Sequence, residues 1–183
     1  MKLINLIEED FTNYKKPGMF LGFPFCSGKC NPKDALPICQ NQQLHCAKLI
    51  DISAEEIITR YYNNPIPRCL IFGGLEPFDT FDDMVEVIDA LHNCDSFLPY
   101  GIKKTNTGGY DTIHDSEVII YTGYYPWEIE KQLYKLAEHD PYENILIKFG
   151  RYLPGYKLHY DRNLGVDLAS DNQFSLYLYQ FVS

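Results

Sequence analysis

The chain has few basic residues, and this shortage limits the partners that it can bind. It contains 16 lysine and arginine residues against 25 aspartate and glutamate residues, so its formal net charge at pH 7 is −9. A surface with this charge repels phosphate backbones and anionic lipid headgroups. We therefore expect neither nucleic acid nor a membrane surface as a partner.

Long hydrophobic runs and targeting signals are also missing. No apolar stretch approaches the roughly 20 residues that a membrane-spanning helix needs. The first residues lack the basic and then apolar pattern of a secretory signal peptide, because Glu8, Glu9 and Asp10 follow soon after Met1. The sequence therefore predicts a cytoplasmic protein. A phosphate-binding glycine loop, a dinucleotide-binding fingerprint and a Ser-His-Asp order are absent too, which argues against those chemistries.

The apolar content that is present suits one domain. Of the 183 residues, 45% are hydrophobic and 22% are charged, and no internal repeat divides the chain. A chain of this size and composition can bury a sizeable core, whereas two full domains would be cramped. We therefore predict a single domain over residues 1–183.

Short apolar runs alternate with amphipathic patterns along this domain. Three helices are predicted, beginning after Ser53, after Thr80 and near Pro126. Four runs rich in β-branched or aromatic residues are predicted to be buried strands: Met19 to Phe25, Cys69 to Phe72, Val118 to Tyr121 and Ile145 to Phe149.

This alternation predicts an α/β fold with a mostly parallel sheet, because each helix would cross between two parallel strands. A full eight-fold barrel needs about 250 residues. The sequence therefore favours an open, partial β/α barrel. Residues 95–116 are predicted only to form a long excursion from this pattern, because glycines and polar residues dominate them.

The residues that follow each predicted strand are expected to meet at one edge of the sheet, where parallel α/β folds bind ligands. These segments are Cys26 and Cys30, then Gly73-Gly74-Leu75-Glu76-Pro77, then Thr122-Gly123-Tyr124, and finally Gly150-Arg151-Tyr152. The glycines allow a ligand to approach the backbone closely, and Glu76 offers a carboxylate to a cationic group. On its own, this glycine segment favours a tight turn.

Four of the six cysteines lie within 21 residues, at Cys26, Cys30, Cys39 and Cys46. A reducing compartment disfavours disulfides and favours metal or redox roles for such a cluster. An iron-sulfur cluster suits the irregular spacing. A four-thiol zinc site, with His45 as a possible replacement ligand, is the alternative. Cys69 and Cys94 stand apart in apolar or helical contexts and are predicted to be buried core thiols.

Five segments in order resemble the radical S-adenosylmethionine (SAM) enzymes, and among them the activating enzymes of anaerobic (class III) ribonucleotide reductases. Cys26-x3-Cys30-x8-Cys39-Gln40-Asn41 resembles their C-x3-C-x2-C motif with six residues inserted. Gly73-Gly74-Leu75-Glu76 is similar to their GGE motif, with Leu75 as an extra residue. Three later segments resemble a strand ending in WTGY, a VDGRF-type strand that has Lys148-Phe149 in place of the acid, and a GSSNQ segment: Ile119 to Tyr124, Ile147 to Tyr152 and Ala169 to Gln173.

The resemblance implies a set of roles for these residues. Cys26, Cys30 and Cys39 would ligate a [4Fe-4S] cluster, and Cys46 would be dispensable. Glu76 would accept a hydrogen bond from the amino group of SAM. The other SAM-binding residues implied are Gly73, Gly74, Thr122, Ser170 and Asn172, of which Ser170 and Asn172 would meet the methionine carboxylate or the ribose.

The implied reaction is reductive cleavage of SAM to a 5′-deoxyadenosyl radical, with no catalytic residue beyond the cluster and SAM. The implied partners are a glycyl-radical enzyme such as anaerobic ribonucleotide reductase and a low-potential electron donor such as flavodoxin. The altered motifs leave two alternatives open. One is a radical SAM enzyme that acts on another peptide or on a small molecule, and the other is a non-catalytic zinc-binding interaction module.

Overall fold

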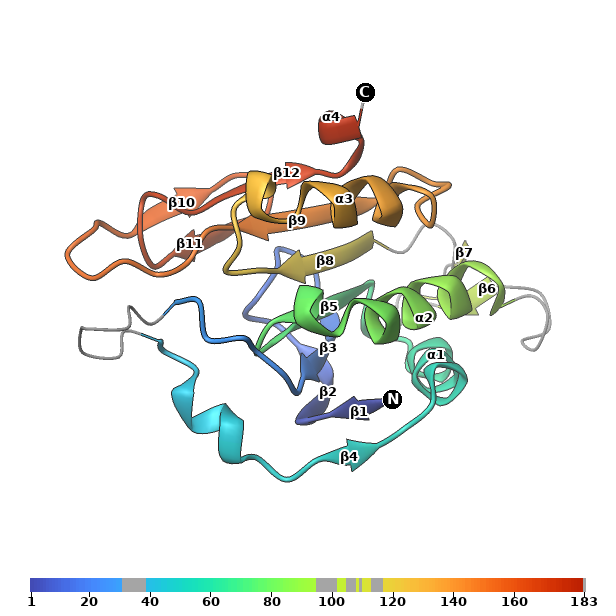
Figure 1. Cartoon of the computed structure of the whole chain (residues 1–183). Helices are drawn as coiled ribbons and strands as arrows, with labels where there is room; N and C mark the ends of the chain where they lie inside the picture. The colour runs from blue at the N-terminus through green and yellow to red at the C-terminus, as the bar shows by residue number, and fades with distance from the viewer. Residues whose placement is uncertain (31–38, 95–101, 105–107, 109, 113–116, 183) are drawn as a thin grey trace.

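A six-stranded, mostly parallel sheet forms the centre of the protein in a computed structural model that describes residues 1–30, 39–94, 102–104, 108, 110–112 and 117–182 (Figure 1). The order of the strands is β12-β9-β8-β5-β3-β2. In chain order, the strands are β2 (Asn5–Asp10), β3 (Gly18–Phe23), β5 (Cys69–Gly74), β8 (Glu117–Tyr121), β9 (Ile145–Phe149) and β12 (Phe174–Tyr177).

The four inner strands run parallel to one another, while β2 and β12 pair antiparallel at the two edges of the sheet. Phe23 of β3 lies opposite Gly74 of β5, and Tyr121 of β8 lies opposite Lys148 of β9. The carboxyl ends of the inner strands therefore share one edge of the sheet. The predicted α/β fold with a mostly parallel sheet is confirmed.

Three helices cover one face of this sheet: α1 (Ala54–Asn63), α2 (Phe81–His92) and α3 (Glu130–Ala137) (Figure 1). Each helix connects two adjacent parallel strands. The hydroxyl of Ser53 accepts a hydrogen bond from the Glu56 N–H at 3.1 Å and so caps α1, as the sequence predicts. The buried side chains of the helices pack into one apolar cluster with alternate residues of the strands, such as Leu70, Phe72 and Ile120.

The other face of the sheet is covered by a hairpin of β10 (His159–Asp161) and β11 (Val166–Leu168). Leu164 and Leu168 of this hairpin pack with Ile71, Ile119 and Leu146 of the strands in a second apolar cluster. The inner strands are thus buried on both faces, which explains why they appear in the sequence as continuous apolar runs.

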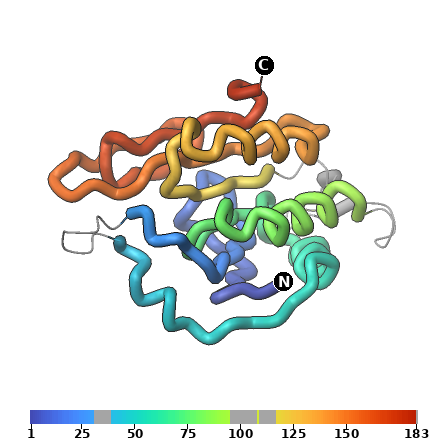
Figure 2. Tube along the Cα trace, viewed as in Figure 1, coloured from blue at the N-terminus to red at the C-terminus, as the bar shows by residue number. Residues whose placement is uncertain are grey.

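Smaller elements complete the described part of the chain. They are β1 (Lys2–Leu3) and β4 (Ile50–Asp51), which pair with each other, the β6 (Ile102–Lys104) and β7 (Tyr110–Thr112) hairpin, the 3-10 turns η1 (Gln42–Cys46), η2 (Pro77–Thr80) and η5 (Pro126–Glu128), and α4 (Tyr179–Val182). Figure 2 follows the chain from β2 at one edge of the sheet to β12 at the other. Among the described residues, no helix is long and apolar enough to cross a membrane.

Several predicted boundaries need correction. The first predicted strand extends to Phe25, but β3 ends at Phe23, because Pro24 has no N–H to continue the ladder. The helix expected near Pro126 begins there as the 3-10 turn η5, and the α-helix follows at Glu130. Part of the 95–116 excursion is the β6–β7 hairpin, and the remainder, apart from Gly108, lies outside the described residues. Cys69 and Cys94 are buried, as predicted.

Candidate functional site

A cavity of about 560 Å³ opens at the carboxyl edge of the sheet and extends along the face that the β10–β11 hairpin covers. This volume lies within the roughly 300–1,000 Å³ that is typical of small-molecule sites. The segments expected at this edge do meet there. The residues that line the cavity include Cys26, Cys30, Cys39, Gly73, Gly74, Glu76, Thr122, Gly123, Lys148, Gly150 and Arg151.

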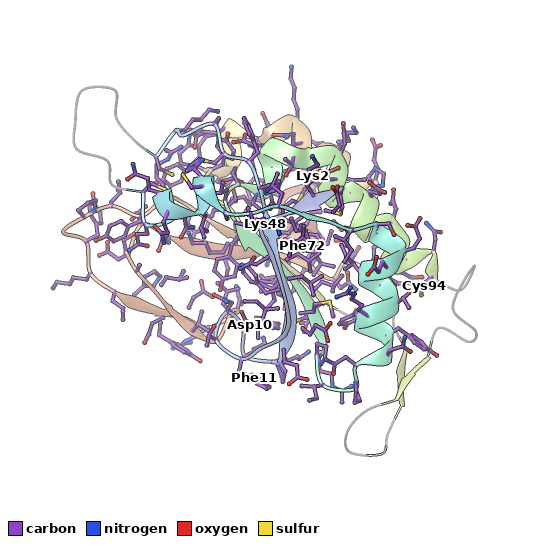
Figure 3. The ribbon with its side chains drawn as sticks, turned by 90° about the horizontal axis from the view of Figure 1, so that it is seen from below. Lys2, Asp10, Phe11, Lys48, Phe72 and Cys94 are labelled. Carbon is purple, nitrogen blue, oxygen red and sulfur yellow. The ribbon has the colours of Figure 1, made fainter. Side chains whose placement is uncertain are left out.

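At its far end, the cavity reaches the turn after β2. Asp10 lines it there and is buried, and its carboxylate accepts hydrogen bonds from the N–H groups of Thr12 at 2.7 Å and Asn13 at 3.0 Å. Figure 3 labels Asp10 beside Phe11 at this turn. The cavity is therefore longer than the cysteine-lined edge and has polar groups at both ends.

Three thiols, those of Cys26, Cys30 and Cys39, are half-buried and line this one cavity. Burial raises the pKa values of Cys26 and Cys30, and neighbouring cysteine thiols raise them further. Cys46 is exposed on η1 and is not among the residues that line the cavity. The residues between Cys30 and Cys39, 31–38, lie outside the described part of the chain.

Within the described ranges, no group of three His, Cys, Asp or Glu residues is close enough together to hold a metal ion. A single zinc ion needs all its sulfur ligands about 2.3 Å away. In an iron-sulfur cluster each thiolate binds a different iron, so its sulfurs lie farther apart. The three thiols around one cavity are the donor set that the structure offers to a metal centre at this edge.

Gly123 leaves space for the Cys30 thiol. A Cβ atom at this position would lie 3.3 Å from the Cys30 Sγ and 3.6 Å from Glu76 Oε2. The first distance is tighter than ordinary van der Waals contact, so a side chain here would crowd the sulfur. The sulfur and the carboxylate therefore approach the same point of the backbone at the end of β8.

Glu76 is buried, with 6% of its surface exposed, and is held by groups of the protein itself. Its Oε1 accepts hydrogen bonds from the Thr122 hydroxyl at 2.7 Å and from the Phe78 N–H at 3.2 Å, and its Oε2 accepts one from the Gly123 N–H at 2.9 Å. Burial raises the pKa of Glu76 to about 7, although these hydrogen bonds oppose the shift. About four acceptor sites exist on a carboxylate, so room remains for one further donor.

The glycine segment before Glu76 is required by the backbone. Gly74 has a φ of +83°, and a Cβ atom there would lie 2.8 Å from the Gly22 Cα of β3. Only glycine tolerates both conditions. The Gly74 carbonyl accepts a hydrogen bond from the Asn41 side chain at 2.8 Å, which ties the chain after Cys39 to this loop.

Two residues to which the sequence assigned no role also line the cavity, although Arg151 was expected at this edge. Lys148 of β9 is buried, and burial lowers its pKa to about 8. Arg151 donates to both carboxylate oxygens of Glu128 at 2.8 Å, and its guanidinium lies over the Tyr125 ring, 5.1 Å from the centroid. Lys148 could have been noticed in the sequence, because it is a charged residue inside an otherwise apolar strand. The pairing of Arg151 with Glu128 could not, because the two residues are 23 positions apart and no local pattern connects them.

Ser170 and Asn172 are near the cavity but are not among the residues that line it; their neighbours Ala169 and Gln173 are. The Ser170 hydroxyl accepts a hydrogen bond from the Leu153 N–H at 3.4 Å. The Asn172 amide donates to the Tyr125 hydroxyl and to the Arg151 carbonyl, both at 2.9 Å. In this arrangement the two side chains hold the loop after β9 in place.

Comparison of the chain with models of protein families, with curated proteins and with solved structures finds no match. The fold and the cavity alone describe the site. It is a thiol-lined cavity at the carboxyl edge of a parallel α/β sheet, with a buried carboxylate and a buried lysine in its walls.

Proposed function

We propose that the chain is a radical SAM enzyme, built as a partial β/α barrel, that cleaves SAM reductively and generates a glycyl radical on a partner enzyme. The observation that carries the proposal is the meeting of Cys26, Cys30 and Cys39 with Gly73, Gly74 and Glu76 in one cavity. These residues come from two of the five segments in which the chain resembles such enzymes. The carboxyl edge of a parallel sheet is also where α/β folds bind their ligands.

Cys26, Cys30 and Cys39 would hold a [4Fe-4S] cluster. When bound, such a cluster has one iron without a protein ligand, which is open to SAM, and supplies the single electron that converts SAM to methionine and a 5′-deoxyadenosyl radical. The chain's own contribution is to bind and orient SAM and to exclude water from the reacting bond. The exposed position of Cys46 on η1 favours this three-thiol site over the four-thiol zinc site.

Glu76 would accept a hydrogen bond from the amino group of SAM with its remaining lone pair. The bonds from Thr122, Gly123 and Phe78 fix the orientation of the carboxylate before the ligand arrives. Without a ligand, burial holds the pKa of Glu76 at about 7. A cationic group beside it would lower this pKa and favour the ionised carboxylate. Gly73 and Gly74 let the ligand approach the backbone beside it.

A glycine on a partner protein is the proposed substrate, and a low-potential donor such as flavodoxin is the proposed reductant. The partner and the donor both rest on the resemblance to class III reductase activating enzymes.

Anaerobic reconstitution tests this function. We expect iron and sulfide to bind in cube proportions, and we expect 5′-deoxyadenosine to form from SAM only when dithionite is added. With the anaerobic reductase from the same source, a doublet electron-paramagnetic signal of a glycyl radical should appear as one equivalent of 5′-deoxyadenosine accumulates. Zinc as the only bound metal would instead identify a structural module. Cleavage of SAM without a radical on the reductase would point to another substrate.

Glu76→Gln is expected to leave the iron content unchanged and to weaken SAM binding about tenfold to hundredfold. The reason is the loss of one charge-assisted hydrogen bond to the amino group, worth roughly 1.5–3 kcal/mol. Equilibrium binding of SAM to the unreduced enzyme measures the effect. Glu86→Gln, which changes an exposed carboxylate of α2 outside the cavity, is the matched control. If the wild type and Glu76→Gln bind SAM equally well, Glu76 does not contact SAM and the glycine segment has only the role of a turn.

A further inference from the structure

Lys148 is a buried cation in the wall of the cavity, where the charges of Glu76 and Cys30 favour its ionised form but do not outweigh its burial. Its side chain projects from β9 on the face that bears the cavity, and 7% of its surface is exposed. The ammonium donates to the Gly150 carbonyl at 2.6 Å, which uses one of its three donors. Among the described residues, no carboxylate forms an ion pair with it.

An ammonium in this position requires a negative partner. Removing a charge from water costs several kcal/mol unless an opposite charge or several hydrogen bonds compensate it. The hydrogen bond to a neutral carbonyl and the charges of Glu76 and Cys30 compensate only part of that cost, because the pKa of Lys148 remains lowered. The cavity beside Lys148 has room for a ligand that supplies the remainder. The lowered pKa of Lys148 is the sign that burial is not yet balanced.

The other charges in the cavity limit which anion fits. Glu76 lines the same cavity, as do three thiols, so the walls hold several acidic groups beside this buried lysine. A phosphate dianion would be repelled by these groups more strongly than a singly charged carboxylate. The combination of an acid and a base in one cavity also matches the amino and carboxylate ends of an α-amino acid.

We propose that Lys148 is a carboxylate-binding residue and makes the site selective for ligands with a free carboxylate. Combined with the proposed function, on which this step rests, the carboxylate is that of the methionine part of SAM. Lys148 donates to this group while Glu76 accepts from the amino group. The resemblance does not provide this contact, because the similar strand has an acid at the corresponding place. Nor do Ser170 and Asn172, whose side chains hold the loop after β9.

Binding of two probes to the reconstituted, unreduced enzyme tests the proposal. The probes are SAM and decarboxylated SAM, which differ only in the carboxylate. The measured quantity is the preference for SAM, expressed as the ratio of the two dissociation constants. We expect this ratio to fall about tenfold to hundredfold in Lys148→Met, as expected for one charge-assisted hydrogen bond. Any ligation of the carboxylate by iron would be present in both proteins, so the change in the ratio between them is assigned to Lys148.

Lys157→Met is the matched control, because Lys157 is exposed and outside the cavity; its ratio should equal that of the wild type. An unchanged ratio in Lys148→Met overturns the assignment of Lys148 and leaves the proposed function standing. If the wild type binds neither probe, the proposed function fails, and methionine and 3-(methylthio)propylamine then replace the probes. Thermal stabilisation of the wild type by methionine alone, lost in Lys148→Met, still supports a carboxylate site. Equal effects of the two compounds overturn it.

Discussion

Cys30→Ala is expected to abolish binding of the iron-sulfur cluster, while Cys46→Ala is expected to retain it. Cys30 is half-buried and lines the cavity, and its sulfur lies close to the backbone at Gly123, where a side chain would crowd it. Cys46 is exposed on η1 and is not among the lining residues. A cluster held by only three thiolates has no spare protein ligand, so removal of one is expected to empty the site. Iron and sulfide analysis after anaerobic reconstitution measures this.

Cys26→Ala and Cys39→Ala should lose the cluster in the same way. Cys69→Ala is a second control, because Cys69 is buried in the apolar cluster that also contains Ile71 and Ile119. That variant should keep its iron and lose only stability. If Cys46→Ala loses the cluster while Cys39→Ala retains it, the third ligand is Cys46 and the assignment made from Cys39-Gln40-Asn41 is wrong.

The centre of the fold was predictable because its local signals and its packing agree. The four inner strands are buried on both faces, so they appear in the sequence as apolar runs. The edge strands β2 and β12 gave no such signal. β2 has the sequence NLIEED with its middle exposed, and β12 is only four residues long. An edge strand needs less burial, and charged residues are common there.

The candidate site was predictable where its residues directly follow strands. The parallel register carries the segments after β3, β5 and β8 to one edge, so Cys26, Glu76 and Thr122 meet without any further assumption. The direction of individual side chains was not predictable. Ser170 and Asn172 bond to the loop after β9, whereas Gln173 lines the cavity. Those contacts join residues about 20 positions apart, and no periodic pattern reports them.

Lys148→Met is expected to stabilise the metal-free, ligand-free protein by about 2 kcal/mol at pH 7. Burial lowers the pKa of Lys148 from 10.5 to about 8, and 1.36 kcal/mol per pKa unit makes this a cost of roughly 3 kcal/mol. Loss of the hydrogen bond to Gly150 offsets about 1 kcal/mol of the gain. For a chain of this length the melting temperature should rise by about 4–8 °C. Urea unfolding gives the free energy directly.

The pH dependence distinguishes this cause from a simple improvement in packing. Because the folded-state pKa of Lys148 is lowered, the unfolded chain binds more protons between pH 8 and 10.5, and the stability of the wild type rises with pH across that window. Lys148→Met lacks this contribution. The free energy of unfolding of Lys148→Met should therefore exceed that of the wild type by the full amount at pH 7, and the excess should shrink toward pH 10.5. Glu76 has the opposite sign: its raised pKa makes stability fall as pH rises from 4.5 to 7.

Glu76→Gln should remove the fall in stability between pH 4.5 and 7 and should leave the rise between pH 8 and 10.5 intact. An advantage of Lys148→Met that stays constant from pH 7 to 10.5 would contradict an uncompensated lysine. Added methionine should narrow the difference in the free energy of unfolding between the wild type and Lys148→Met, because its carboxylate stabilises only the protein that has the ammonium. The lysine thus lowers the stability of the empty site and raises its affinity for a carboxylate, as residues in binding sites commonly do.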